Sequence, residues 1–387
     1  MKILILSTWD TYGGAARAAF RLHEALLQNG IDSTMLVDDS KSDLNTVVTL
    51  QNKNLCEKIF KKLNKIMRMF SDKLSLVKYE KTMTKKFGTF SPQIISNKKL
   101  VNRINEINPD IVHLHWICGG FLSIENIAEI KAPIVWSLHD MWAFTGGCHT
   151  VAEQTRTYGV DDMPLCCEMC EKYAENCGNC PLLGSKKTKD LSFSVLQRKK
   201  KSFAKAANMT IVGVSGWMAN CAKKSAVFVA RKSVVLPNPL DTKIFKPIPK
   251  DVCRELWNLP KNKKLVLFGS ILATSTPYKG YDKLLETLNK IKTKNVECVV
   301  FGSREPKDPP KIPQKIHYIE RLLFSTYFTC TRNMPAKGRR EEVESLVSPV
   351  FLLGTFENNT IAFFRYSRSN FNSAQKILIY LLCRVGA

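Results

Sequence analysis

The sequence predicts an α/β protein made of two Rossmann-like halves. Its first apolar run, residues 3–6, is followed by the pair Gly13-Gly14 and by an alanine-rich stretch with helical spacing of apolar residues, which ends at Gly30. A second apolar run at residues 34–37 completes the strand, glycine turn, helix and strand that open a parallel sheet. The same order of elements begins again at residue 265, after a proline-rich segment.

The other expected elements follow from apolar runs between turns. Prolines 237, 239, 247 and 249 turn the chain repeatedly, which indicates a linker near residue 245. The 387 residues suffice for two or three domains of common size. Further strands are predicted at residues 111–114, 134–138, 212–215, 234–236, 265–268 and 296–301, and a helix over residues 282–291.

The composition is that of a globular protein with a large positive charge. Hydrophobic residues make up 44% of the chain and charged residues 24%, which excludes collagen-like and largely disordered classes. The 58 Lys and Arg residues exceed the 34 Asp and Glu residues by 24. This surplus favours polyanions, anionic lipid surfaces or phosphorylated substrates as partners.

The first residues of the chain bear on the cellular location of the protein. Residues 1–7 are interpreted as a buried strand and not as a signal peptide, because Trp9, Asp10 and two glycines follow where a cleavage site would lie. No apolar run reaches the roughly 18 residues that a transmembrane helix needs. We therefore expect a cytoplasmic protein whose membrane contact, at the inner face, would be peripheral.

A basic segment covers residues 53–103, with 14 Lys and Arg residues against three acidic ones. Its apolar residues fall on one helical stripe, which predicts a basic amphipathic helix. The helix could pack on its own domain with a solvated lysine face, lie on an anionic membrane surface, or serve as a lid. The stripe consists of Cys56, Phe60, Leu63, Met67, Phe70 and Leu74.

Three positions are candidates for anion or sugar chemistry. Gly13-Gly14 precedes a helix N-terminus, where backbone amides can approach an anion, although a structural turn explains the pair equally well. His139 follows a predicted strand, at the sheet edge where ligands of open α/β folds bind, or is an ordinary structural histidine. Lys279 could neutralise a leaving diphosphate, or is a common loop lysine.

The cysteines are concentrated in one segment, which holds six of the thirteen between Cys148 and Cys180. Cys167-x2-Cys170 and Cys177-x2-Cys180 are two paired thiol turns, and four thiolates satisfy a closed structural Zn²⁺ site. A redox pair or reduced surface thiols are the alternatives, and six thiols leave the identity of four ligands open. A closed site has no open position for substrate, so such a zinc ion would be structural.

Several segments together resemble family 4 glycosyltransferases, with the greatest likeness to the branch from bacterial surface-polysaccharide clusters. The likeness covers about residues 1–322, and the combination is more specific than any one segment. The segments are Gly13-Gly14-Ala15-Ala16-Arg17-Ala18, the strand end at His139, Gly146-Gly147-Cys148-His149, Cys177-Gly178-Asn179-Cys180-Pro181, and Leu236-Pro237-Asn238-Pro239-Leu240-Asp241-Thr242 with Phe245 and Pro247.

The resemblance implies a GT-B fold, in which two Rossmann-like domains face each other across a cleft. The N-terminal domain would receive a glycan or lipid-linked acceptor, and the C-terminal domain would hold a nucleotide-diphosphate sugar. A glycosyl group, of the hexosyltransferase type, would be transferred with retention of configuration for surface polysaccharide synthesis. No catalytic metal is expected, because positive side chains and helix N-termini would offset the charge of the leaving diphosphate.

The resemblance also assigns roles to residues. His139 would lie near the transferred sugar and Lys279 on the diphosphate. A cysteine after the glycine pair and a later CxxC-Pro favour Cys148, Cys170, Cys177 and Cys180 as structural zinc ligands, with Cys167 as a substitute. The residues assigned to donor or acceptor binding are Gly13, Gly14, Arg17 and Ser270.

The sequence departs from the family pattern in two ways. Many relatives have an arginine shortly before the lysine, but residues 270–278 contain none, so Thr274 or Ser275 would have to assist Lys279. After Leu322 the pattern stops, and the paired glutamates that bind donor in relatives are absent. We therefore expect a truncated second domain.

These departures define the expected domains. The first, residues 1–245, carries a basic helical insertion (53–103) and a cysteine-rich insertion (146–185). A partial donor-side domain covers residues 246–322, and a poorly packed or disordered tail covers residues 323–387. The chain could accordingly be an inactive remnant of such an enzyme. A zinc-containing nucleic-acid-binding protein is the less favoured alternative, because the basic residues are spread out and no recognition-helix pattern accompanies the cysteines, so no nucleic-acid partner is expected.

Overall fold

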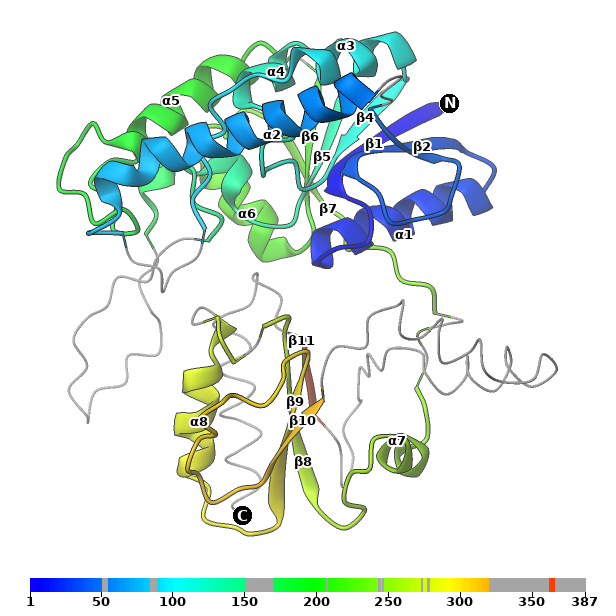
Figure 1. The fold of residues 1–387 in the computed structure, drawn as a ribbon, viewed down its shortest axis with the longest axis vertical. Coiled ribbons are helices and arrows are strands. Elements are labelled where there is room, and N and C mark those ends of the chain that lie inside the picture. The colour runs from blue at the N-terminus through cyan, green and yellow to red at the C-terminus, as the bar shows by residue number, and fades with distance from the viewer. Residues whose placement is uncertain are drawn as a thin grey trace. The chain divides into compact units, whose positions relative to one another are not determined.

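A computed structural model describes the chain over residues 1–50, 55–83, 89–150, 170–206, 208–242, 245, 247–272, 274–276, 279–319 and 362–365, with only the backbone at 55–62, 65 and 362–365. The chain divides into two compact units, Met1–Pro239 and Leu240–Ala387. Each unit contains its own all-parallel sheet (Figure 1). The predicted α/β class with two Rossmann-like halves is therefore confirmed.

The N-terminal unit is built on a seven-stranded sheet in the order β3-β2-β1-β4-β5-β6-β7. Its strands are β1 (Lys2–Trp9), β2 (Asp32–Asp39), β3 (Val47–Thr49), β4 (Ile111–Leu114), β5 (Ile134–Leu138), β6 (Met209–Gly213) and β7 (Lys232–Val235). Its α-helices are α1 (Gly14–Gln28), α2 (Leu55–Leu76), α3 (Lys98–Ile107), α4 (Ile124–Ala128), α5 (Leu191–Phe203) and α6 (Gly216–Lys224). Short 3-10 turns are η1 (Val77–Tyr79), η3 (Trp142–Phe144) and η4 (Lys172–Ala174).

The core of this unit lies on both faces of the sheet, as a central parallel strand requires. On one face Ile3 and Ile5 of β1 pack beneath α1 through Ala19. On the other face Leu4 and Leu6 belong to a larger cluster with residues of α3, α4 and α5. Alternation along an apolar strand thus buries every second side chain under a different layer of helices.

The C-terminal unit has a four-stranded sheet in the order β10-β9-β8-β11. It contains α7 (Lys250–Leu256), β8 (Lys264–Gly269), α8 (Tyr281–Asn289), β9 (Val296–Phe301), β10 (Ile316–Ile319) and β11 (Ala362–Arg365). A short core joins Leu284 and Leu288 of α8 to Cys298 and Val300 of β9. Within the described residues of the tail, β11 pairs with β8. The remainder of residues 320–387, where a poorly packed tail is predicted, lies outside the described residues.

Most strand predictions agree with the structure, and two predictions need correction. The strand expected at residues 212–215 runs earlier, over Met209–Gly213, because Ser215 instead caps α6 by accepting the Met218 amide. The basic segment 53–103 is not one helix: α2 ends at Leu76, and α3 begins only at Lys98. Among the described residues, no helix combines the length and apolar composition needed to span a bilayer.

Candidate functional site

The strand order of the N-terminal sheet has its switch point between β1 and β4. β1 leads to β2 on one side, while the chain returns to β4 on the other, and ligands of open α/β sheets bind at such a switch point. Thr8 joins the two strand ends, since its hydroxyl donates to the Cys118 carbonyl at 2.7 Å. Beside it the rings of Trp9 and Trp116 stack with centroids 4.9 Å apart.

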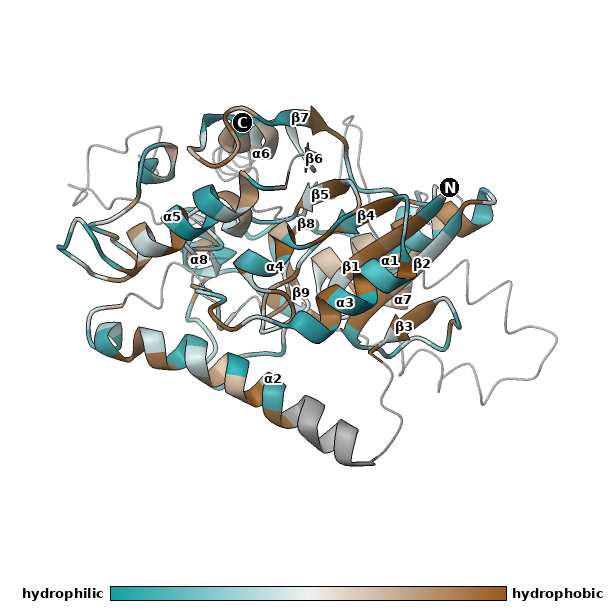
Figure 2. Cartoon of the chain, turned by 90° about the horizontal axis from the view of Figure 1, so that it is seen from above, coloured by the Kyte–Doolittle hydropathy of each residue, from teal (hydrophilic) through white to brown (hydrophobic). Residues whose placement is uncertain are grey.

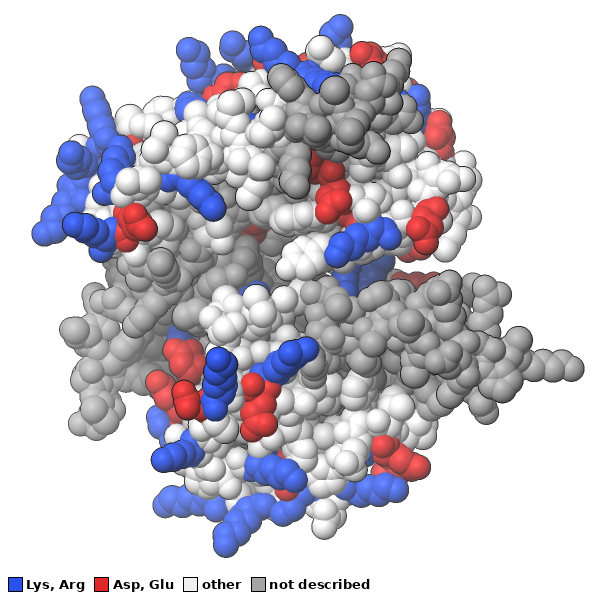
Figure 3. Space-filling model, viewed as in Figure 1, with Lys and Arg blue, Asp and Glu red and all other residues white. Residues whose placement is uncertain are grey.

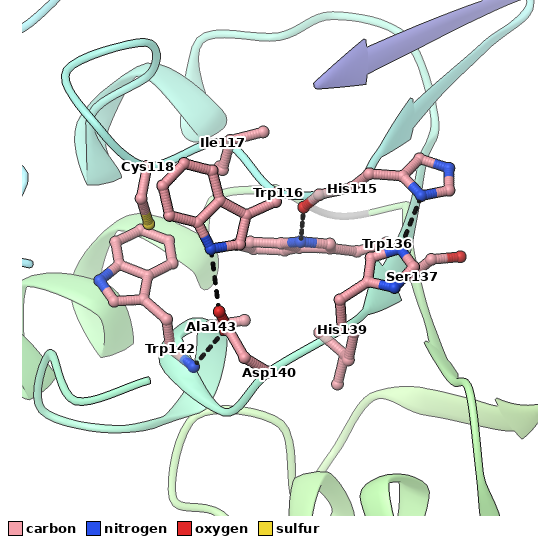
Figure 4. Close-up of a pocket in the computed structure, with 11 residues that line it drawn as sticks. His115, Trp116, Ile117, Cys118, Trp136, Ser137, His139, Asp140, Trp142 and Ala143 are labelled. Carbon is pink, nitrogen blue, oxygen red and sulfur yellow. Dashed lines mark hydrogen bonds between the residues drawn. The ribbon is translucent and has the colours of Figure 1, made fainter. Parts of the chain in front are cut away.

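Two histidines from adjacent strand ends form a direct hydrogen bond. Nδ1 of His115, after β4, lies 2.8 Å from Nε2 of His139, after β5 (Figure 4). His115 is buried, His139 is half-buried, and their rings stack with centroids 5.1 Å apart. Burial, with the neighbouring histidines His113 and His139, holds the pKa of His115 well below its usual range. His115 is therefore neutral at physiological pH.

Asp140 organises the loop that follows β5. Its carboxylate accepts hydrogen bonds from the indole of Trp116 at 2.9 Å and from the backbone amide of Trp142 at 2.9 Å. It also lies 2.7 Å from Nδ1 of His149, whose Nε2 in turn lies 2.9 Å from the Ser91 hydroxyl. One buried carboxylate thus fixes the position of both walls of the pocket in Figure 4.

A buried lysine on α5 also binds the loop that follows β5. The ammonium of Lys199, on α5, donates to the carbonyls of Trp142 and Thr145 and lies 3.8 Å from the centroid of the Trp142 ring. Burial is the main reason that its pKa falls to about 7. The loop backbone between β5 and Cys148 is therefore tied to α5 as well as to Asp140.

The glycine turn after β1 leaves an open helix N-terminus. Gly13 is the N-cap of α1 with φ +91°, and no side chain caps the helix there. A Cβ atom at Gly13 or Gly14 would meet nothing within 4 Å, and Gly14 is exposed, so there is open space beside the start of α1. Arg17 lies in the first turn and its Nε donates to the Thr11 carbonyl at 3.2 Å. This is the geometry that suits an anionic group.

Two predicted residues belong to the C-terminal unit. Ser270 directly follows β8, and its amide donates to the Phe301 carbonyl at 3.1 Å. Lys279 is half-buried one residue before Gly280, the left-handed N-cap of α8. Between them the hydroxyls of Thr274 and Ser303 lie 2.6 Å apart. These residues share the carboxyl edge of that unit's sheet, and His139 belongs to the other unit.

The four predicted zinc ligands are free thiols in the N-terminal unit. Burial raises the pKa of Cys148, and charge on Cys180, Cys177 and Cys170 raises it further. In the part of the chain that the structure covers, however, no three His, Cys, Asp or Glu side chains are grouped as a metal site requires. Cys167, the substitute ligand, lies outside the described residues.

The backbone around these thiols is closely packed. Cys177, Gly178 and Asn179 all have positive φ, of 56°, 90° and 43°, which curls the chain between Cys177 and Cys180. A Cβ atom on Gly178 would lie 2.0 Å from the Thr188 carbonyl oxygen, and one on Gly146 would lie 2.4 Å from that of Ser192. The cysteine segment is thus pressed against the start of α5.

The structure adds residues that the sequence analysis did not single out. Trp9, Trp116 and Asp140 lie at the strand ends, where position alone could have drawn attention to them. Lys199 gave no such signal, because it lies 57 residues from its partner Trp142 along the chain. The structure brings His115, His139 and Asp140 to one pocket.

The fold and site define an α/β protein with a Rossmann-like N-terminal unit and a pocket beyond the carboxyl ends of β4 and β5. The family model of Glycosyltransferase Family 4 matches residues 12–244, which is more than half of the chain. The chain therefore belongs to glycosyltransferase family 4. No curated protein matches the chain as a whole or in part.

Solved structures of glycosyltransferases are similar at low identity. A glycosyltransferase from Rickettsia africae is 16% identical over 78% of this chain and 60% of its own, with a TM-score of 0.40. Anabaena Alr3699/HepE in complex with UDP and glucose is 13% identical over 78% of this chain and 61% of its own, with a TM-score of 0.39. WaaG, a glycosyltransferase involved in lipopolysaccharide biosynthesis, is 10% identical over 84% and 72%, with a TM-score of 0.43. The chain thus spans about 60% of the length of the first two.

Proposed function

We propose that this chain is a nucleotide-sugar glycosyltransferase that transfers a hexosyl group, with retention, to a glycan or lipid-linked acceptor of a surface polysaccharide. Family membership supports the reaction class. The observation that carries the assignment to a site is the hydrogen bond between His115 and His139 at the carboxyl ends of β4 and β5. In the reaction, the acceptor's hydroxyl oxygen bonds to the anomeric carbon while the donor's bond to diphosphate breaks. The electron pair of that bond leaves with the diphosphate, whose oxygen takes the proton of the acceptor hydroxyl.

The hydrogen bonds of His115 indicate which nitrogen of His139 carries a proton. Nε2 of His115 is buried and has no hydrogen-bond partner among the described residues. A proton there would be an unsatisfied buried donor, which is rarer in proteins than an unsatisfied acceptor. The proton of His115 therefore sits on Nδ1 and is donated to Nε2 of His139. His139 must then carry its own proton on Nδ1, so it acts as a hydrogen-bond donor.

In this proposal each predicted residue has a distinct task. His139 is the catalytic residue that donates from Nδ1 to an oxygen of the transferred sugar, and His115 is a positioning residue. The open amides at Gly13 and Gly14, with Arg17, bind an anionic group of donor or acceptor. Ser270 and Lys279 bind the diphosphate and offset the charge that develops on it.

The test combines turnover with a direct reading of the histidine tautomers. Against a panel of nucleotide-diphosphate sugars, His139→Ala should lower the rate of transfer or hydrolysis at least about 100-fold, the usual scale for one preorganised donor. The control is His317→Gln, a histidine of β10, which should leave the rate unchanged. Two-bond ¹H–¹⁵N spectra should show His139 protonated at Nδ1. An unchanged rate in His139→Ala would reject its catalytic role.

The inactive alternative gives a different result in the same assays. A remnant that has lost the donor half would neither bind nor consume any sugar nucleotide of the panel, with the histidine spectra unchanged. Donor binding without turnover would mean that the site is retained but chemistry is lost.

We also propose that Cys148, Cys170, Cys177 and Cys180 bind a structural zinc ion. The donor type suits zinc, since these four cysteines form no disulfide and thiolates are ligands of structural zinc. The backbone groups of Leu182 and Leu183 hydrogen-bond to the thiol of Cys180, as second-shell amides do for metal thiolates. When bound, the ion would cross-link the segment to the rest of its domain, and it would take no part in the reaction.

Metal analysis of the full chain tests this directly. We expect one zinc ion per chain, lost on chelation together with thermal stability. Cys180→Ser should lower the zinc content and the melting temperature, whereas Cys253→Ser, at a buried free cysteine of α7, should leave the zinc content unchanged. Zinc-free protein whose unfolding does not respond to added zinc or chelator would refute the site.

A further inference from the structure

Helix α2 carries its apolar stripe on the side that faces solvent. Six large apolar side chains, Leu63, Ile66, Met67, Phe70, Leu74 and Val77, are each between 52% and 62% exposed. Their spacing of three or four residues puts them on one face of α2 and of the short turn η1 that continues it. Single exposed apolar residues are ordinary, but a continuous stripe of this kind marks an interaction surface.

The opposite face of α2 is polar and packs on the domain. Arg68 is only 8% exposed, and its Nε donates to the Gly120 carbonyl at 2.6 Å. One turn later Asp72 accepts the Ile94 amide at 3.1 Å. Tyr79, in η1, is buried and accepts the Leu191 amide on its hydroxyl at 3.1 Å. These specific contacts fix the rotation of the helix, so the apolar stripe cannot turn inward without breaking them.

Basic residues flank the exposed stripe. Lys73 precedes Leu74 and Lys78 follows Val77, so the two lysines lie on either side of the stripe, and both are exposed. Lys81 is also exposed, and Glu80 is the one exposed acidic residue between positions 73 and 81. In Figure 2 α2 lies at the margin of its unit, and Figure 3 shows lysines and arginines beside an uncharged surface of that unit.

We propose that this face of α2 docks on the anionic surface of a lipid bilayer. The six side chains would enter the boundary between headgroups and acyl chains, while the lysine stems extend so that their ammonium groups meet lipid phosphates. A second copy of the chain fits less well, because pairing two stripes would bring the same lysines together in a protein of net charge +24. The inference is independent of the proposed reaction, since it involves no residue of the pocket.

Vesicle flotation of the full chain tests the proposal without any sugar donor. The chain should float with vesicles of phosphatidylcholine containing about one third phosphatidylglycerol, and at least about tenfold less with phosphatidylcholine alone. The double variant Phe70→Ser, Leu74→Ser should lose at least about tenfold in binding. Its control is Val229→Ser, Val235→Ser, which changes two valines of the same unit that are 70% and 53% exposed and should bind as the original chain does.

The lysines and the oligomeric state give the remaining outcomes. Lys73→Gln and Lys78→Gln should each weaken binding to the anionic vesicles roughly fivefold. All of these positions are exposed, so circular dichroism and melting temperature should stay unchanged. Binding by the Phe70, Leu74 variant that equals the original would overturn the proposal. A dimer in sedimentation that this variant dissociates would overturn it too, and would assign the stripe to a second copy.

Discussion

The first strands of the two units, β1 and β8, occupy the same place in their sheets but are buried differently. Leu4, Ile5 and Leu6 of β1 are fully buried, and helices cover both faces of the strand. In β8, Leu265 is buried, whereas the residues from Val266 to Gly269 are half-buried. An apolar run therefore specifies a strand, but its burial depends on elements that the rest of the chain must supply.

The carboxyl edges of the two sheets also differ, in the kind of side-chain group that joins their loops. Beyond β5, the buried carboxylate of Asp140 and the buried ammonium of Lys199 each join segments distant in sequence. Beyond β8, the hydroxyls of Thr274 and Ser303 bond to each other at 2.6 Å. The carboxyl edge of the N-terminal sheet is thus held by buried charged groups, whereas the bond beyond β8 joins two neutral ones.

Equivalent truncations in β1 and β8 should give the largest contrast. Leu6→Ala removes a fully buried side chain and should lower the free energy of unfolding of the N-terminal unit by about 3–5 kcal/mol. Leu267→Ala removes a half-buried one and should cost about 1–2 kcal/mol. Hydrogen exchange in urea, followed separately for peptides of each unit, measures both. Equal losses would contradict the difference in burial.

The second largest effect is expected from acid, which should destabilise the N-terminal unit. Burial, with a contribution from His139, lowers the pKa of His113 to about 4, against 6.5 for an ordinary histidine. The unfolded chain therefore binds more protons between these values, so this stability is complete above pH 6.5 and is lost as the pH falls toward 4. The loss should approach about 3 kcal/mol.

The control for this pH dependence is the variant His113→Gln, which removes the half-buried imidazole. Unfolding by urea at several pH values, read on the N-terminal unit, should show a smaller slope for the variant. Burial also lowers the pKa of His23, so some slope should remain. A slope identical to that of the original chain would show that His113 does not cause it.

The smallest contrast is expected between variants at the carboxyl edges of the two sheets, which should differ in how much stability they lose. Asp140→Asn weakens charge-assisted bonds in a buried site and should cost about 1.5–3 kcal/mol. Thr274→Val breaks a neutral bond and should cost about 1 kcal/mol in the C-terminal unit. Thermal unfolding of both variants, with Thr287→Val on α8 as a control for loss of a threonine hydroxyl, compares them. A larger loss of stability in Thr274→Val than in Asp140→Asn would contradict this expectation.

The strands were predictable because buried parallel strands are continuous apolar runs. β4, β5 and β9 lie at the predicted residues, while β3 escaped notice because three residues are too short for a pattern. His139 was predicted as a candidate from its place after a strand, and its role stays a prediction. The role of Asp140 was not predicted, because its partners Trp116 and His149 are brought to it only by the fold.

The orientation of α2 shows a limit of another kind. Periodicity identified its apolar stripe, but an isolated stripe does not say which side meets the domain. That choice depends on Arg68 and Asp72, whose backbone partners Gly120 and Ile94 lie in loops that no helical pattern locates. A polar face can pack inward when each polar group finds a partner there.

The close approach of Gly146 and Gly178 to the start of α5 limits how this domain can be altered by evolution or by engineering. Any side chain at either position would collide with a carbonyl oxygen at Ser192 or Thr188, so only glycine is tolerated without moving the helix. The cysteine segment and α5 must therefore be inherited, exchanged or transplanted as one piece. A chimera that took the cysteines alone from a relative would join two surfaces that do not match.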